Sequence, residues 1–148
     1  MLMTTGADCP PVLFYDPIKQ AVGNIHVGWR GLLQGIVFNA VEILKNKCGC
    51  KAENINVFIG PGLESCHFEV GDDVAEQFIE DYKEFITGNN NKKQVDLKGI
   101  IKFILLNNGI KNDNIDVSPD CTFCCGDLYS SHRREGKGFK AMGGGYWN

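Results

Sequence analysis

Short apolar runs closed by turn-forming residues alternate along this chain with longer stretches whose apolar residues recur at helical spacing. The runs 12–15 and 21–27 stop at Asp16-Pro17 and at Gly28, so each predicts a buried strand, and the two could pair as a hairpin. A glycine-interrupted run near the end could close the sheet as a last strand. The predicted strands are residues 12–15, 21–27, 55–59, 115–117 and 139–147.

Three stretches carry one apolar stripe at helical spacing and predict amphipathic helices. The first starts at Leu33 and meets a stop at Gly49, and the second is capped by Asp72 or Asp73. The polar residues 88–93 predict an exposed loop, the segment most expected to move. The predicted helices cover residues 33–44, 72–85 and 96–108.

These elements predict a mixed α/β (α+β) fold, with a mixed β-sheet core flanked by about three amphipathic helices. A length of 148 residues suits one hydrophobic core, and the sequence shows no internal repeat or linker, so residues 1–148 are expected to form a single domain. The hydrophobic share of 43% and the charged share of 22% are ordinary for globular chains and exclude a disordered one.

Charge and apolar run length restrict what the chain binds. A net charge of −3 does not provide the basic surface that nucleic acids require, so no nucleic-acid partner is expected. No apolar run approaches the ~18 to 20 residues that cross a bilayer, and the first residues lack a signal-peptide pattern, so we expect a cytoplasmic protein without membrane contact. Seven unevenly spaced cysteines favour free thiols over a disulfide framework.

Cys9 and His26 form the central chemical pair that the sequence suggests. Cys9 lies in a turn before the first predicted strand and His26 at the end of the second, and adjacent strand ends can bring the two together. A cysteine within hydrogen-bond reach of a histidine can yield a thiolate that attacks a carbonyl or binds a metal. On spacing alone, a small buried thiol and a histidine satisfied within its strand explain the pattern equally well.

The segment Gly28-Trp29-Arg30-Gly31 follows His26 directly and enters the first predicted helix. Its backbone N–H groups and the Arg30 guanidinium could hold a phosphate or a carboxylate. A tight strand-to-helix connection, with Arg30 in a structural ion pair, is the equally weighted alternative.

Two segments, TGADCPPVL at residues 5–13 and HVGWRG at 26–31, closely resemble two signatures of the laccase-domain, or polyphenol oxidase, family of YfiH-like proteins. GPG at 60–62 leading to CHFEVG at 66–71, Cys121-Thr122, and SHRREG at 131–136 resemble its later signatures in the expected order. The resemblance spans nearly all 148 residues. It implies a YfiH-like fold of the cysteine-hydrolase type.

The resemblance also implies an activity and a cofactor. Members of the family are described as zinc-dependent purine nucleoside phosphorylases, with methylthioadenosine phosphorolysis and adenosine deamination as further activities. Their zinc is held by a histidine of an upstream Gln-Val-His-Gly motif, by the cysteine that matches Cys9 and by the histidine that matches His26. Two imidazoles and one thiolate leave a fourth position open for water or substrate, as in catalytic zinc sites.

This chain has only eight residues before Cys9, and none of them is a histidine. We therefore expect a form that lacks the N-terminal part of the family, and a homodimer would be one way to replace the missing ligand. His67 and His132 are the other histidines, and neither is assigned as a ligand. Copper is less favoured than zinc, because copper oxidases need several histidine-rich sites.

The remaining polar residues of the family segments are candidates for anion binding and proton transfer. Arg134, beside Arg133, is assigned to the substrate phosphate, against the alternative of one solvent-facing and one structural arginine. Glu69 and Asp8 are candidate general acids or bases, or equally solvated or capping carboxylates.

The other cysteines offer a second site of weaker support. Cys121-x-x-Cys124-Cys125 could bind zinc together with Cys48-x-Cys50, but a second Cys-x-x-Cys pair is missing. Packed thiols are the favoured interpretation, also for Cys66.

The leading hypothesis is therefore a purine nucleoside phosphorylase that acts on a purine nucleoside and phosphate, with Cys9 and His26 as catalytic and metal-binding residues and Arg30 and Arg134 holding substrate. A Cys/His hydrolase or amidase built on the same pair is one alternative. An inactive or partner-dependent module is the other.

Overall fold

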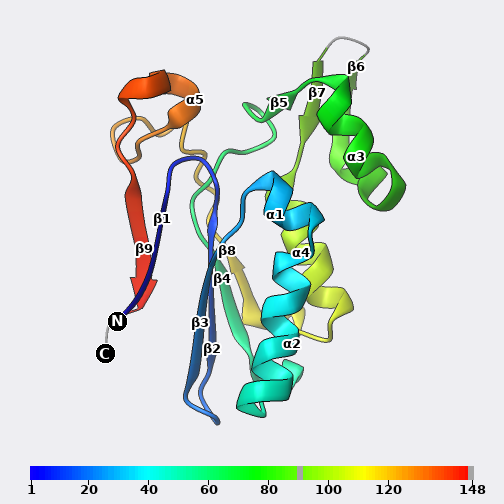
Figure 1. The fold of residues 1–148 in the computed structure, drawn as a ribbon, viewed down its shortest axis with the longest axis vertical. Helices are drawn as coiled ribbons and strands as arrows, with labels where there is room; N and C mark the ends of the chain where they lie inside the picture. Colours follow the sequence, from blue (N-terminus) through cyan, green and yellow to red (C-terminus); the bar gives the residue numbers. More distant parts are fainter. Residues whose placement is uncertain (90–91, 147–148) are drawn as a thin grey trace.

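The computed structural model describes residues 1–89 and 92–146. Its largest sheet has four strands in the order β3-β2-β4-β8, in which β2 pairs antiparallel with both neighbours and β4 pairs parallel with β8. The predicted hairpin is confirmed, and so is the mixed character of the sheet (Figure 1). The strands are β2 (Pro11–Asp16), β3 (Ala21–His26), β4 (Asn56–Ile59) and β8 (Ile115–Val117).

Local chemistry explains the hairpin. The Asp16 carboxylate accepts hydrogen bonds from the backbone N–H groups of Ile18 (2.8 Å) and Lys19 (3.0 Å), which fixes the turn between β2 and β3. Residues alternate along β2, so that Val12 and Phe14 are buried in the core. The turn and the alternation together set the register in which Pro11 faces His26.

Helices α2 (Ile36–Cys48) and α4 (Leu97–Asn107) lie together on one side of this sheet (Figure 1). The first predicted helix is shorter than expected at its start, because Gly35 adopts a left-handed conformation (φ 78°) and separates α2 from a short α1 (Trp29–Leu33). Gly49 ends α2 in the same conformation, as predicted, and the Asp96 side chain caps α4 by accepting the Gly99 N–H. The apolar stripes join the core through Val37, Val41, Leu44, Ile100, Ile101 and Leu105.

A second sheet of three strands, β5 (Glu69–Val70), β7 (Lys92–Val95) and β6 (Ile86–Asn89), lies beside α3 (Asp72–Tyr82). The prediction of a loop over 88–93 is wrong at both ends, since strand pairing continues to Asn89 and resumes at Lys92. Polar composition suggested a loop, but backbone pairing to a neighbouring strand decides the conformation. Residues 90 and 91 lie outside the described part of the chain.

The third sheet pairs β1 (Leu2–Gly6) with β9 (Met142–Tyr146) in antiparallel fashion. The sequence predicted the last strand, but not β1, and β9 does not close the main sheet. Both strands pack over β2 and β3 on the side away from α2 (Figure 1), and a Cβ at Gly144 would lie 3.0 Å from Pro11 Cβ. Glycine therefore permits this close approach. Trp147 lies outside the described residues.

The mixed α/β class is confirmed, with five α-helices in the described residues where about three were expected. Within the ranges that the structure describes, each helix is too short or too polar to cross a bilayer. Single-domain organisation and the cysteine-hydrolase-type label stay predictions. The remaining elements are α5 (His132–Glu135) and the 3₁₀ turns Ala52–Asn54, Lys83–Phe85, Asn112–Asn114 and Gly136–Gly138.

Candidate functional site

The turn that carries Cys9 is fixed through its neighbour Asp8. Asp8 has φ 74°, a left-handed conformation that is uncommon for a residue with a side chain. Its carbonyl accepts the Leu63 N–H at 2.7 Å, and its two carboxylate oxygens accept the Thr122 hydroxyl and the Arg133 N–H, each also at 2.7 Å. These bonds hold the strained turn and support the capping role for Asp8, because both oxygens already have protein partners.

His26 lies at the end of β3, directly across from this turn, where Val27 N–H donates to the Pro10 carbonyl. The His26 Nδ1 lies 3.0 Å from the Thr5 carbonyl oxygen, which can only accept, so Nδ1 carries the proton and Nε2 has the free lone pair. A carbonyl partner on the second ring nitrogen is the usual arrangement of a metal-binding histidine.

Cys9 Sγ and His26 Nε2 converge beside Gly28. A Cβ placed on Gly28 would lie 3.3 Å from Cys9 Sγ and 3.7 Å from His26 Nε2. The strand ends thus bring the two side chains together as expected, while their catalytic and metal-binding roles stay predictions. No third cysteine, histidine or carboxylate joins them in the described residues to make a three-ligand group.

Burial, and then the neighbouring charge of Asp8, raises the pKa of the Cys9 thiol. In the metal-free chain this thiol is therefore mostly protonated at neutral pH. A bound cation would reverse that balance, because it favours the thiolate.

Two hollows adjoin the pair. The first, of ≈ 250 Å³, is lined by Cys9 and His26 together with residues of β1 and β9, including Thr5 and Gly144. The second, of ≈ 480 Å³, shares Cys9 and His26 and adds His132 and Arg133. The larger volume falls within the range of about 300–1,000 Å³ typical of small-molecule sites.

The two arginines predicted to hold substrate lie elsewhere. Arg30 is exposed, with its guanidinium carbon 4.1 Å from the ring centre of Trp29, and it lines neither hollow. The Arg134 guanidinium donates to the carbonyls of Thr122, Phe123 and Tyr129 and to the Glu135 carboxylate. Substrate binding by either arginine stays a prediction.

Arg133, in contrast, borders the larger hollow, although both of its terminal nitrogens donate to the Glu69 carbonyl. The Glu69 carboxylate points to Lys92, at 3.4 Å. Glu69 is not among the described residues that line the two hollows, and its role in proton transfer stays a prediction.

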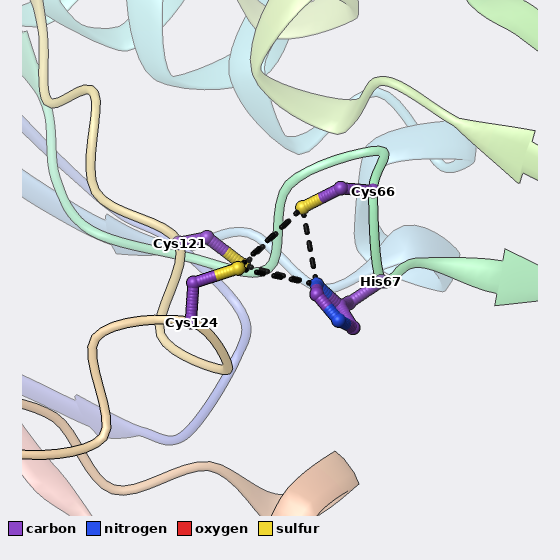
Figure 2. Close-up of side chains that lie close together, drawn as sticks. All are labelled: Cys66, His67, Cys121 and Cys124. Carbon is purple, nitrogen blue, oxygen red and sulfur yellow. Dashed lines mark hydrogen bonds between the residues drawn. The ribbon is translucent and has the colours of Figure 1, made fainter.

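A cluster that was not predicted from the sequence lies nearby (Figure 2). Cys66, His67, Cys121 and Cys124 place their Sγ and Nδ1 atoms within 4.8 Å of one another. The signals were an adjacent Cys-His pair and a Cys-x-x-Cys motif, but the Cys-x-x-Cys motif was considered only with other cysteines. Cys50 is instead buried near Asp16 of the hairpin turn, where burial raises the pKa of its thiol to about 11.

The thiols of this cluster influence one another. Burial, and then hydrogen bonds to Cys121 and Cys124, raises the pKa of Cys66 to about 12. Burial would also raise the pKa of Cys121, but backbone N–H groups of Glu64, Cys124 and Phe123 donate to its sulfur and lower it. Three thiols this close cannot all ionise without a cation.

Comparisons with known proteins complete the description. A family model described as multi-copper polyphenol oxidoreductase laccase matches residues 1–145. Purine nucleoside phosphorylase YlmD of Bacillus subtilis is 34% identical over 133 residues, which are 87% of this chain and 48% of the relative. Purine nucleoside phosphorylase LACC1 of Mus musculus is 34% identical over 139 residues, 90% of this chain and 32% of the relative.

Among solved structures, the crystal structure of the Bacillus licheniformis hypothetical protein YfiH superimposes with a TM-score of 0.88 at 33% identity. The match covers 95% of this chain and 55% of that one. The chain therefore spans roughly a third to a half of the length of the curated relatives it matches.

Proposed function

We propose, since this chain belongs to the multi-copper polyphenol oxidoreductase laccase family, that it is an enzyme of the purine nucleoside phosphorylase type. The names of its relatives support this activity, and the family membership confirms the resemblance seen in the sequence. The finer parts of the proposal are zinc as the metal, and adenosine, inosine or methylthioadenosine as substrates, with adenosine deamination as a further activity. They rest on the resemblance.

One observation carries the proposal. Cys9 Sγ and His26 Nε2 point to one place on the wall shared by two hollows, and the second nitrogen of the imidazole is bound to the Thr5 carbonyl. A thiolate and an oriented imidazole suit zinc. The described residues supply two ligands of such a centre. The resemblance assigns the third to an upstream histidine, and a second copy in a homodimer would be one way for this chain to replace it.

Phosphorolysis forms a bond between a phosphate oxygen and C1′ of the ribose while the bond from C1′ to the purine nitrogen breaks. The purine leaves with that electron pair and takes up a proton. When bound, zinc would supply Lewis-acid stabilisation of charge next to Cys9 and His26. The larger hollow would hold the nucleoside, with Arg133 at its border to attract the phosphate anion.

A Cys/His hydrolase would use the same two residues. It needs a thiolate at neutral pH without metal, whereas burial and Asp8 raise the pKa of Cys9. The metal-dependent reaction is therefore the better supported of the two.

The test combines metal content with activity. The purified chain is incubated with a purine nucleoside, with and without phosphate, and release of the free base is followed by chromatography. We expect phosphate-dependent release that is lost in Cys9→Ala and in His26→Ala but kept in Cys48→Ala, whose exposed thiol lies at the end of α2. Base release that survives both site variants, or that does not depend on phosphate, would contradict the proposal.

A further inference from the structure

We propose that Cys66, His67, Cys121 and Cys124 form a second metal centre, a closed tetrahedral zinc site that fastens together the two loops supporting the Cys9 turn. The inference does not depend on the proposed activity, because none of these four residues lines either hollow beside Cys9. It concerns a structural rather than a catalytic metal.

The distances between the four atoms match the edges of a zinc tetrahedron. Zinc–sulfur bonds of about 2.3 Å and zinc–nitrogen bonds of about 2.0–2.1 Å at tetrahedral angles give edges of about 3.8 Å between two sulfurs and about 3.5 Å between sulfur and nitrogen. The Cys66 sulfur lies 3.8 Å from that of Cys121 and 3.9 Å from that of Cys124. The His67 Nδ1 lies 3.1, 3.9 and 3.4 Å from the sulfurs of Cys66, Cys121 and Cys124.

The four side chains are also oriented to bind a metal. The His67 Nδ1 faces the three sulfurs (Figure 2), and its ring stacks on Phe123 with 4.0 Å between ring centres. The Cys121 sulfur accepts backbone N–H groups of Phe123 and Cys124 within the same Cys-x-x-Cys turn. Such bonds stabilise a thiolate and hold it in place for a metal.

A disulfide explains the arrangement less well. A disulfide joins two sulfurs at about 2.05 Å, whereas the Cys66 sulfur lies at nearly equal, longer distances from two partners. Either pairing would leave a third thiol and the imidazole without a role. Three cysteines and one histidine are a common ligand set for structural zinc, and four protein ligands leave no open position for substrate.

The centre would act on Cys9 through the loops. Gly62 and Cys121 form a parallel bridge, so the loops after β4 and β8 run side by side. Leu63 in the first loop and Thr122 in the second both donate hydrogen bonds to Asp8. A metal that joins the loops would therefore position the Asp8–Cys9 turn, without touching substrate itself.

The first test maps thiol protection on the intact chain. Reduced protein is alkylated with N-ethylmaleimide in the presence and absence of zinc, and each cysteine is followed by peptide mass spectrometry. We expect zinc to slow the modification of Cys66 and Cys124 several-fold and to leave that of the exposed Cys48 unchanged. Equal rates with and without zinc at Cys66 and Cys124 would overturn the proposal. Protection of Cys9 is read separately and reports on the catalytic proposal.

The second test uses cobalt(II) as a spectroscopic substitute in the double variant Cys9→Ser/His26→Ala, which removes the other pair. We expect one cobalt per chain, with thiolate-to-cobalt charge-transfer bands and intense tetrahedral d–d bands. Adding Cys124→Ser should abolish or strongly weaken these bands, whereas adding Cys125→Ser, a neighbour outside the cluster, should not. Absence of the bands in the double variant, or equal loss with Cys125→Ser, would refute the site. If Cys124→Ser does not fold, the cobalt spectrum of the double variant and the thiol-protection rates still test the proposed site.

Discussion

Arg134→Ala distinguishes the two roles that the sequence left open for this arginine. The guanidinium donates to three carbonyls, those of Thr122 (2.8 Å), Phe123 (2.8 Å) and Tyr129 (2.6 Å). Hydrogen bonds to charged groups contribute about 1.5–3 kcal/mol each. The side chain is 28% exposed, so water can replace part of each bond in the variant, and we take about 1 kcal/mol for each. The expected loss of unfolding free energy is about 3 kcal/mol.

This loss converts to a melting temperature through the entropy of unfolding. At about 2.1 cal/mol/K per residue, unfolding of 148 residues carries about 0.31 kcal/mol/K, so Tm should fall by about 10 °C. Calorimetry or circular dichroism measures the shift. Arg133→Ala is the matched control, since this exposed side chain donates to a single carbonyl and should cost about 1 kcal/mol, or about 3 °C.

Arg134→Lys adds a second comparison, because one ammonium group cannot reproduce the planar fork that reaches three carbonyls. It should recover less than half of the lost stability. If Arg134→Ala melts within a few degrees of the wild type and instead raises only KM for phosphate, the structural role is wrong and the substrate role predicted from the sequence is right.

Three further predictions concern single positions. In Gly6→Ala the new Cβ would lie 2.8 Å from His26 Cε1, so the imidazole must move away from the Thr5 carbonyl. Metal affinity at Cys9 and His26, measured by competition with a chelator, should therefore fall about 10–100-fold. Gly28→Ala places a methyl 3.3 Å from Cys9 Sγ and 3.7 Å from His26 Nε2 and should weaken binding of the same metal about tenfold or more, with cobalt bands from the other cluster unchanged. Burial would raise the pKa of Asp16, but hydrogen bonds from the N–H groups of Lys19 and Ile18 lower it. The ionised carboxylate therefore stabilises the folded state above its unfolded pKa of about 3.9, and this stabilisation is lost as pH falls below that value. Urea midpoints should therefore fall less between pH 7 and pH 3 in Asp16→Asn than in the wild type, and an equal fall would contradict this role.

Much of the local structure could be predicted from the sequence because it depends on neighbours along the chain. Alternation in β2 and helical spacing in α2 and α4 reflect which side chains share a face, and that is a property of local periodicity. The turn at Asp16 and the stop at Gly49 follow from single residues. Errors arose where strand pairing overrode local composition. β1 pairs with β9 at the other end of the chain, and the polar residues described within 88–93 belong to a hairpin whose strand β7 also pairs with β5.

The sequence by itself determined the family and the mixed α/β class. It also suggested that Cys9 and His26 meet, because both lie at the open end of one hairpin, in which Pro11 pairs with His26. Only the tertiary structure decided that Cys66 and His67 meet Cys121 and Cys124, more than fifty residues later. The physical reason is the parallel pairing of β4 with β8, which sends the loops after both strands to the same edge of the sheet. No local pattern records which strands become neighbours.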